Sequence, residues 1–247
     1  MKVSIITVCY NSEKTIEHTI QSVLSQDYPD IEYLLIDGQS RDQTIDIANK
    51  YKQHIAKIVS EKDNGMYDAI NKGIQLASGD IIGILNADDF YIDKKVISKI
   101  VHLFQTKRTD SVYADLVYVK RDNTDKIVRY WKSKPYKYGL FLKGWMPPHP
   151  TFFVKKIVYD KYGLYTTQLS SAADYEFMLR VLHRHKISTA YLPEVIIKMR
   201  IGGKSNLNLK NRLKANLEDR KAWKMNHLKP NILTLTIKPL LKIYQYF

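Results

Sequence analysis

The chain has few of the residues that build covalent or low-complexity scaffolds. Cys9 is the only cysteine among 247 residues, and there are 10 glycines and 8 prolines. A single cysteine excludes an intramolecular disulfide and a cysteine-rich zinc site, so a reducing, cytosolic environment is expected. The apolar fraction of 45% is too high for a disordered chain, and the ordinary glycine and proline content excludes fibrous proteins.

Long apolar runs and the common nucleotide-binding motifs are also absent. No uninterrupted run approaches the ~20 residues that a helix needs to cross a bilayer. The run Val3–Val8 has only Lys2 before it and no small-residue cleavage site after it, so we expect no signal peptide. No G-x-G-x-x-G follows the first predicted strand and no G-x-x-x-x-G-K-[ST] occurs, which disfavours a dinucleotide-binding Rossmann domain and a P-loop.

Acidic residues are too few to balance the basic ones. Lys and Arg number 39 against 25 Asp and Glu, a net charge of +14, which predicts a polyanionic partner such as nucleic acid, an anionic membrane or a phosphorylated small molecule. From residue 198 onward, only Glu218 and Asp219 oppose the basic residues. A nucleic-acid-binding protein needs its cations along a groove with interleaved aromatics. The concentration in the tail instead favours a catalytic body with a surface-docking end, and we expect no nucleic-acid partner.

Short β-type runs and helical patterns alternate over the first hundred residues. Strands are predicted at residues 3–10, 31–36, 55–59 and 81–85, with helices beginning near residues 16, 45, 66 and 96. Ser12 is expected to cap the first helix, and Gly79 to end the third as its C′ residue. The alternation predicts an α/β fold with a parallel sheet and right-handed crossovers, whose ligands bind beyond the carboxyl ends of the strands.

After about Thr106 this alternation stops. Val112–Val119 and Lys126–Trp131 are expected to form a hairpin, and the residues from there to Pro150 to be mostly loop. Beyond it we predict a helix over Ala173–Arg184, extended chain over Ile187–Met199 and a helix over Leu209–Met225.

Acidic residues recur where the predicted strands end. Asp37 follows the second strand, Asp63 the third, and Asn86-Ala-Asp88-Asp89 the fourth. One Asp at a turn is usually a cap, but like charges on one edge repel unless a cation joins them. These oxygen ligands suit Mg²⁺ or Mn²⁺, and Mg²⁺ is usually shared with substrate phosphates, so a diphosphate ligand is implied. Asp37 can accept a hydrogen bond from a ribose hydroxyl or from N3–H of uracil.

These segments resemble the family 2 inverting glycosyltransferases of the GT-A fold, a Rossmann-like, mostly parallel sheet flanked by helices. The matching segments are 3–11, 35–44, 63–73 and 77–89, and then, more loosely, 173–180. Within the family the chain looks most like transferases that build bacterial O-antigen, capsule or exopolysaccharide. The resemblance reaches about Asn206. It implies a GT-A domain over 1–206, with a nucleotide-sugar-binding half at 1–106 and an acceptor half at 107–206, followed by a basic amphipathic extension at 207–247.

The resemblance also gives roles to individual residues. Tyr10 would stack on uracil, Asp37 would fix it, and Asp63 would lie beside the base or ribose. Asn86-Ala-Asp88 occupies the family's Asp-x-Asp position, so Asp88 would be the principal metal ligand, with Asp89 and Asn86 in support. The implied nucleotide-sugar-binding residues in this half are Thr7, Tyr10, Asn11, Asp37, Asp63, Asn71, Lys72 and Ala87. The implied cofactor is Mn²⁺ or Mg²⁺.

Asp174 has two interpretations. It precedes a helical run and can be an N-cap. The apolar residues at i+3, i+4, i+7 and i+8 put it at the head of the buried stripe, and in the family the Asp at this position is the general base. We favour the base, with Glu176 as the reserve candidate.

Three residues further along remain open between binding and structural roles. His149 matches a His segment of this subgroup or is a polar residue in a rigid proline turn. Arg200 and Lys204 flank Gly202-Gly203, which either wraps the diphosphate through backbone N–H groups or forms a plain turn.

The expected reaction is transfer of a sugar from a nucleotide-sugar donor, UDP-linked, to a hydroxyl of a growing, lipid-linked bacterial surface glycan, with inversion. The alternative is a nucleotide-sugar-binding protein without catalysis.

Residues 207–247 combine nine basic residues with apolar and aromatic ones, which is typical of a segment lying in an anionic membrane surface. We therefore expect a peripheral location on the cytoplasmic face of the inner membrane. Alternatively, these apolar residues pack on the catalytic domain or on a second subunit.

Overall fold

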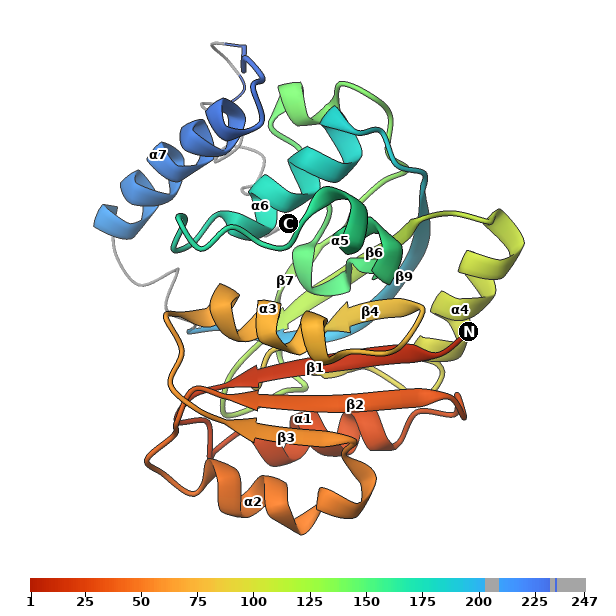
Figure 1. Ribbon diagram of the computed structural model, residues 1–247, viewed down its shortest axis with the longest axis vertical. Coiled ribbons are helices and arrows are strands. Elements are labelled where there is room, and N and C mark those ends of the chain that lie inside the picture. The colour runs from red at the N-terminus through yellow and green to blue at the C-terminus, as the bar shows by residue number, and fades with distance from the viewer. Residues whose placement is uncertain (203–208, 232–233, 235–247) are drawn as a thin grey trace.

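The computed structural model describes residues 1–202, 209–231 and 234 (Figure 1). In this part of the chain one mixed sheet has the strand order β3-β2-β1-β4-β8-β6-β9-β5, with β7 paired to β6. The strands are β1 (Val3–Cys9), β2 (Ile31–Asp37), β3 (Lys57–Ser60), β4 (Ile81–Ile84), β5 (Asp89–Tyr91), β6 (Ser111–Val119), β7 (Ile127–Trp131), β8 (Phe153–Lys155) and β9 (Thr189–Arg200).

Parallel pairing holds the first half of the sheet together. β1 pairs in parallel with β2 and β4, and β2 with β3, so their carboxyl ends meet at one edge (Figure 1). The predicted α/β fold and the hairpin β6–β7 are confirmed. The second half is mixed, because β8 runs antiparallel to β4 and β6 while β9 runs parallel to β6.

Helices cover both faces of the sheet. They are α1 (Ile16–Leu24), α2 (Thr44–Lys50), α3 (Met66–Leu76), α4 (Val96–Lys107), α5 (Lys156–Tyr162), α6 (Ala173–Met178) and α7 (Leu209–Met225). Single turns of 3₁₀ helix lie at η1 (Lys52–His54), η2 (Leu140–Lys143) and η3 (His149–Thr151), and α6 continues as a π-helical segment, η4 (Leu179–Arg184).

The alternation of side chains along each strand divides the core in two. Ile6 and Leu34 face α3 and α6, whereas Ile5 and Leu35 face α1, α2 and α4. Both strands are buried along nearly their whole length, which is why apolar residues predominate on both of their faces.

Two predicted helix ends are wrong in detail. The N-cap of α1 is Thr15; Ser12 contributes its carbonyl, which accepts a hydrogen bond from Ile16 N at 2.9 Å. Helix α3 is capped at Ala77, and Gly79 lies against β1. A Cβ at Gly79 would lie 2.6 Å from Ser4 Oγ, so glycine is required there for close packing of the chain and not for a left-handed turn.

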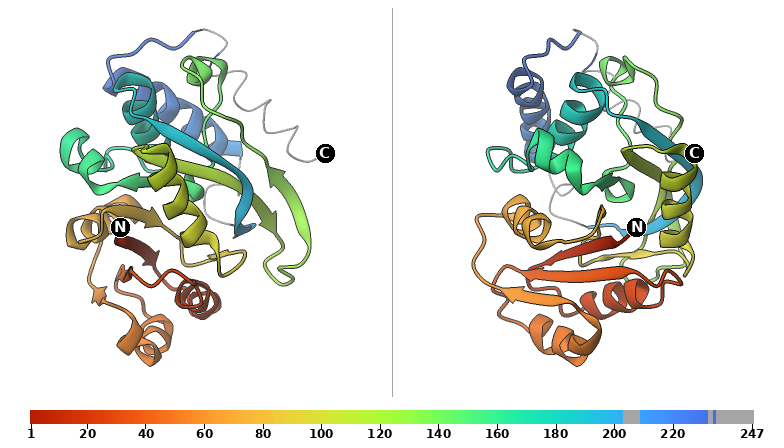
Figure 2. Two further views of the ribbon diagram at one scale, coloured as in Figure 1. Left: turned by 90° about the vertical axis from the view of Figure 1, so that its right-hand side faces the viewer. Right: turned by 45° about the vertical axis from the view of Figure 1, so that its right-hand side comes forward.

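Helix α7 packs on the domain beside α6 and η4, as two further views show (Figure 2). Ala222 and Trp223 are buried in the core cluster that contains Phe177 and Met178. For these residues the alternative of packing on the domain is the one observed. Among the helices that the structure describes, none combines the length and apolar character needed to span a bilayer.

Candidate functional site

Tyr10, Gly38 and Asp63 come together where β1 and β2 end. Tyr10, just after β1, is 51% exposed. Next to it Gly38 follows β2, and a Cβ at this glycine would lie 3.0 Å from Asp63 Oδ2 and 3.5 Å from Tyr10 Cδ2. Glycine therefore keeps the space between the Tyr10 ring and the Asp63 carboxylate free. An aromatic face beside a carboxylate can stack a planar base and accept its N–H groups.

Lys72 of α3 forms close ion pairs with two acidic residues, one of which is Asp63. Its Nζ lies 2.6 Å from Asp63 Oδ1 and 2.9 Å from Glu61 Oε1. Hydrogen bonds to Asp63 and Glu61 raise the pKa of Lys72 above its ordinary value, so the amine stays charged. Lys72 thus fixes Asp63 beside Gly38.

Thr7 and Asp37, predicted to contact the nucleobase, are both fully buried. Thr7 Oγ1 accepts a hydrogen bond from Tyr33 OH at 3.1 Å. Asp37 accepts hydrogen bonds from Ser40 N at 2.9 Å, from Ser60 Oγ at 2.6 Å and from Ser40 Oγ. Both side chains are therefore engaged inside the fold, and in this conformation a direct contact with a base is closed to them.

Asn11 and Asn71 also have structural partners. Asn11, at φ +50°, receives a hydrogen bond from Arg41 N at 2.9 Å and donates its own N–H to Ser40 Oγ, which fastens the loop after β2 to the end of β1. Asn71 exchanges two hydrogen bonds with the backbone of Tyr165, at 2.8 and 3.0 Å. Asn71 thereby ties α3 to the loop that follows α5.

The segment after β4 carries the candidate metal ligands. Asp88 is partly exposed, and burial raises the pKa of its carboxyl, although Arg121 and Arg200 oppose this rise. Asp89 is fully buried, and burial together with the charge of Asp88 raises its pKa well above the ordinary value. Ala87 is buried, with its carbonyl accepting a hydrogen bond from Thr19 Oγ1 at 3.0 Å.

The donor set of this segment suits a metal that is shared with phosphates. No group of three or more His, Cys, Asp or Glu side chains that could hold a metal ion occurs within the described residues. Asp89 Oδ1 has no hydrogen-bond partner among them, and Asn86 Nδ2 donates to Asp89 Oδ2 at 3.2 Å. Since Mg²⁺ is usually held by only one or two carboxylates plus substrate phosphates, Asp88 and Asp89 fit such an ion.

Arg200, the last residue of β9, lies beside this segment. The antiparallel pairing of β5 with β9 sets Asp89 opposite Met199 and thereby brings Arg200 beside Asp88. Arg200 Nη1 donates to the Asp88 carbonyl at 2.6 Å, Nη2 lies 2.8 Å from His18 Nδ1, and the guanidinium lies over the Phe90 ring. Lys204 lies outside the described residues.

Asp174 is the centre of a second cluster. It is the second residue of α6, whose N-cap is Ala172, so the capping alternative is wrong. Its Oδ1 accepts a hydrogen bond from Tyr67 OH at 3.2 Å, and its Oδ2 lies 3.1 Å from His149 Nδ1. The Asp174 side chain remains 17% exposed. Three elements, α6, α3 and η3, thus hold one carboxylate at the surface.

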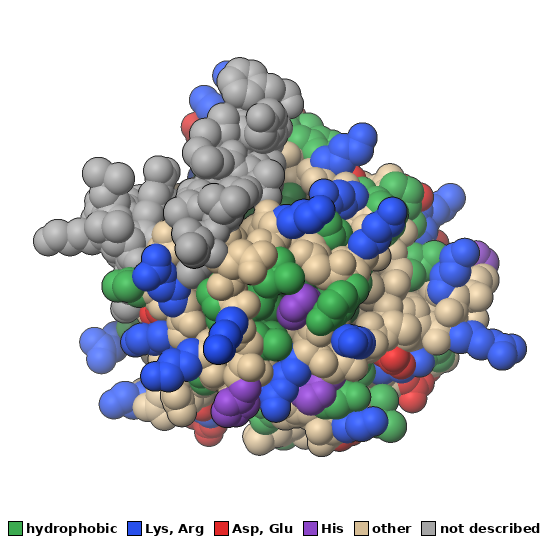
Figure 3. Space-filling view, turned by 90° about the horizontal axis from the view of Figure 1, so that it is seen from above, with side chains coloured by type: hydrophobic (Ala, Val, Ile, Leu, Met, Phe, Trp, Pro, Cys, Tyr) green, Lys and Arg blue, Asp and Glu red, His purple; other side chains and the backbone are tan. Residues whose placement is uncertain are grey.

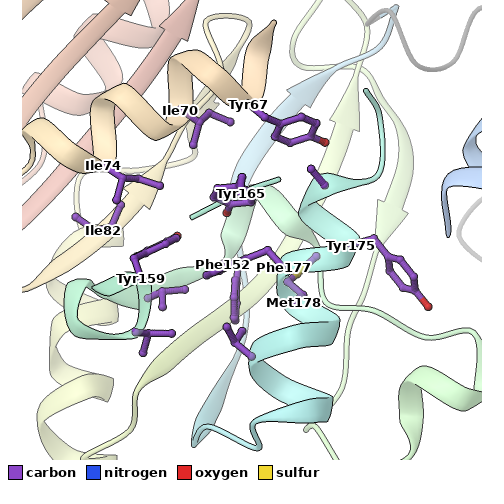
Figure 4. Close-up of a cluster of buried hydrophobic side chains, with 14 of the residues drawn as sticks. Tyr67, Ile70, Ile74, Ile82, Phe152, Tyr159, Tyr165, Tyr175, Phe177 and Met178 are labelled. Carbon is purple, nitrogen blue, oxygen red and sulfur yellow. The ribbon is translucent and has the colours of Figure 1, made fainter. Parts of the chain in front are cut away.

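A column of aromatic rings supports this cluster. Figure 4 shows Tyr67 projecting from α3, with Tyr165 and Phe177 below it. The Tyr67 and Tyr165 rings stack at 5.8 Å, and those of Tyr165 and Phe177 lie 4.7 Å apart. His149 meets Trp131 edge-on at 6.3 Å. His149 of the proline turn η3 thus contacts both Trp131 and Asp174.

Glu176, the reserve base, faces the other way. Its side chain is buried, with Oε2 3.1 Å from Arg180 Nη2 and Oε1 accepting from Asn226 Nδ2 at 3.0 Å. Both oxygens are engaged in packing α6, which leaves Asp174 as the more exposed of the two carboxylates. Tyr67 was not anticipated, although it lies inside the matching segment 63–73, because no sequence rule pairs it with a residue on α6.

Residues 4–161, more than half of the chain, match the model of glycosyl transferase family 2. An uncharacterized glycosyltransferase of Mycobacterium tuberculosis is 32% identical over 180 residues, covering 72% of this chain and 68% of the relative. The UDP-Glc:alpha-D-GlcNAc-diphosphoundecaprenol beta-1,3-glucosyltransferase WfaP of Escherichia coli is 36% identical over 145 residues, which cover 57% of this chain and 55% of WfaP. This chain thus matches about half the length of WfaP.

Two solved structures share the fold. TarS of S. aureus in complex with UDP-GlcNAc superposes with a TM-score of 0.71 at 18% identity, covering 92% of this chain and 65% of TarS. The mannosyltransferase PcManGT from Pyrobaculum calidifontis, in complex with GDP-Man and Mn²⁺, gives a TM-score of 0.68 at 18% identity, covering 98% of this chain and 69% of PcManGT. The protein is therefore a member of glycosyl transferase family 2 with the GT-A fold.

Proposed function

We propose that this protein transfers a sugar from a UDP-linked donor to a hydroxyl of a lipid-linked bacterial surface glycan, with inversion and with a divalent metal. The observation that carries the proposal is the partly exposed Asp174 carboxylate, which Tyr67 and His149 hold in place. The names of the similar proteins support the substrates: WfaP acts on a diphosphoundecaprenol-linked sugar, and the two solved structures contain nucleotide sugars.

Asp174 is the general base of this reaction. Its carboxylate accepts the proton of the acceptor hydroxyl while that oxygen forms a bond to the anomeric carbon of the donor. The bond between the anomeric carbon and the diphosphate oxygen breaks on the opposite face, and the nucleoside diphosphate leaves. One displacement inverts the anomeric configuration, and no enzyme nucleophile is required.

The donor half binds the nucleotide between Tyr10 and Asp63 and the diphosphate near Asp88 and Arg200. The guanidinium of Arg200 adds positive charge close to the leaving group. Asp88, with Asp89 behind it, would hold Mn²⁺ or Mg²⁺, which supplies further positive charge to the diphosphate. Residues 1–106 then form the donor half and 107–206 the acceptor half, while α7 of the segment 207–247 packs on the latter.

Asp174→Asn tests the proposal. The variant keeps the size of the side chain but removes the base, so we expect loss of sugar transfer from a UDP-sugar panel to a lipid-linked acceptor, with unchanged melting temperature and unchanged UDP binding. Transfer at the wild-type rate would overturn the assignment. If the wild-type protein binds UDP but forms no product with any donor in the panel, a non-catalytic binding protein is the correct function.

A further inference from the structure

Helix α7 reaches the segment that carries the proposed base. Glu218 of α7 is 5% exposed and receives five hydrogen bonds from the three residues that precede α6. Ser170 contributes its N at 3.2 Å and its Oγ at 2.7 Å, Ser171 its N at 2.8 Å and its Oγ at 2.9 Å, and Ala172 its N at 3.1 Å. One carboxylate thus fixes the backbone immediately before Asp174.

Glu218 is charged in this arrangement. Burial alone would raise the pKa of Glu218, but the hydrogen bonds from Ser170 and Ser171 outweigh it and hold the pKa below its ordinary value. Charge-assisted hydrogen bonds of this kind are about twice as strong as neutral ones. Three backbone N–H groups before α6 donate to this carboxylate, which lies on α7, 46 to 48 residues away in sequence.

Other contacts anchor α7 so that Glu218 cannot move freely. Trp223 Nε1 donates to Tyr175 OH at 2.9 Å, and Asn226 Nδ2 donates to Glu176 Oε1 at 3.0 Å. Tyr175 and Glu176 are the next two residues of α6 after Asp174. Helix α7 therefore makes hydrogen bonds to residues before Asp174 and to residues after it. Tyr67 and His149 orient the Asp174 carboxylate itself.

We propose that Glu218 is a positioning residue for sugar transfer: from α7 it sets the start of α6 and thereby the place of the Asp174 carboxylate. This inference rests on the proposed function, since Asp174 must be the base for its position to matter. The segment beginning at α7 then completes the active site in addition to any role at a membrane. A misplacement of about 1 Å at a catalytic group can cost about 100-fold in rate.

The test compares Glu218→Gln and Glu218→Asp with Glu194→Gln, an exposed carboxylate paired with Lys99 at 2.7 Å on the opposite edge of the fold. We expect Glu218→Gln to lower kcat by about 10-fold with little change in the KM of the donor, because most of the proposed donor-binding residues belong to the other half. Glu218→Asp should recover part of the rate, and Glu194→Gln should equal the wild type. A Glu218→Gln protein with wild-type kcat below its melting temperature would overturn the inference.

A double-mutant cycle separates positioning from general destabilisation. If Glu218 acts through Asp174, adding Glu218→Gln to Asp174→Asn should leave the residual rate unchanged, whereas independent effects would multiply. Multiplied effects therefore contradict the inference. If Asp174→Asn itself retains transfer, it is the proposed function that fails, and the two failures are distinguishable.

Discussion

Tyr67 and Asp174, 107 residues apart in the chain, are joined by a hydrogen bond of 3.2 Å between the phenol and Oδ1. Tyr67 belongs to the donor half and Asp174 to the acceptor half, so this bond crosses the proposed division of the domain. Burial and the neighbouring Asp174 charge raise the pKa of Tyr67, which keeps its proton available for donation. The bond can therefore fix the position of the proposed base, Asp174, relative to the donor half.

Removing this hydroxyl should slow transfer without disrupting the fold. We expect Tyr67→Phe to lower kcat by about 10-fold, because the base loses one of the two groups that orient it. The KM of the donor should change little. Steady-state kinetics with a UDP-sugar and a lipid-linked acceptor measure both constants.

Tyr191→Phe is the matched control. Tyr191 OH donates to Asp115 Oδ1 at 2.8 Å, so the variant also removes a tyrosine–aspartate bond, but one between β9 and β6. Its expected effect is a lower melting temperature with wild-type kcat. Equal rate losses in the two variants would show that the Tyr67 bond has no special part in the reaction.

The metal prediction concerns Asp88. Replacing this partly exposed carboxylate by an amide removes the negative charge that a divalent ion needs, so Asp88→Asn should weaken Mn²⁺ binding in the presence of UDP by at least about 10-fold. Titration of Mn²⁺ by calorimetry or electron paramagnetic resonance measures this directly. Asp93→Asn, at an exposed position after β5, is the control and should bind Mn²⁺ as the wild type does. Unchanged Mn²⁺ affinity in Asp88→Asn would exclude Asp88 as a ligand.

The long apolar elements could be predicted from the sequence because their burial patterns are regular. Strands β1 and β2 are buried at six or seven consecutive residues, and helix α3 buries one stripe over eleven residues. Strands β5 and β8 have three residues each and were not predicted, nor was α5. Three residues show no period, and these strands exist because β9 and β4 offer them backbone partners.

The same distinction applies to the site. The acidic strand ends and Asp174 were identifiable, since a motif marks each of them. The burial of Asp37 was not, because it depends on Ser40 and Ser60 folding over the carboxylate. The proposed role of Glu218 could not be predicted either, because in sequence it is one of two acidic residues in a basic segment. Only the packing of α7 brings it to Ser170 and Ser171.

Stability at low pH should depend on Glu32, a buried residue near the start of β2. Burial alone would raise its pKa, but hydrogen bonds from Ser4, Ser78 and Lys2 outweigh it and hold the pKa at about 2. A carboxyl whose pKa is depressed in the folded state stabilises the protein above its unfolded pKa and loses that contribution as pH falls toward the folded value. The loss should occur between about pH 4.5 and pH 2.

Glu32→Gln tests this pH dependence. The lowered pKa corresponds to roughly 3 kcal/mol, so the variant should be less stable than the wild type by an amount of this order at pH 7. The difference should shrink as pH falls below about 4.5, which denaturant unfolding at several pH values measures. Asp30→Asn, an exposed position just before β2, should show no such convergence. A constant difference at all pH values would contradict the depressed pKa.

The last prediction concerns association with a membrane, for which two parts of the chain supply charge. Seen from above, the face at the top of Figure 1 carries many Lys and Arg and few acidic side chains (Figure 3). Elsewhere in the described chain the exposed Tyr138 packs on His183, with Lys186 Nζ 4.8 Å from the Tyr138 ring. In sequence, residues 232–247 add Lys238 and Lys242 among aromatic and aliphatic residues. Each such cation near an anionic surface contributes about 1 kcal/mol.

We therefore expect the full-length protein to co-sediment with liposomes that contain anionic phospholipid at low salt, and to be released at high salt because the attraction is screened. Truncation after Asn231 should weaken binding while the fold is retained, since it spares α7 and its buried Trp223. Lys99→Ala, on helix α4, is the control for loss of a single charge and should bind as the wild type does. If the truncated protein sediments as the full-length protein does, with an unchanged melting temperature, residues 232–247 are excluded as the membrane-binding segment. If sedimentation does not depend on salt, an electrostatic mechanism is excluded.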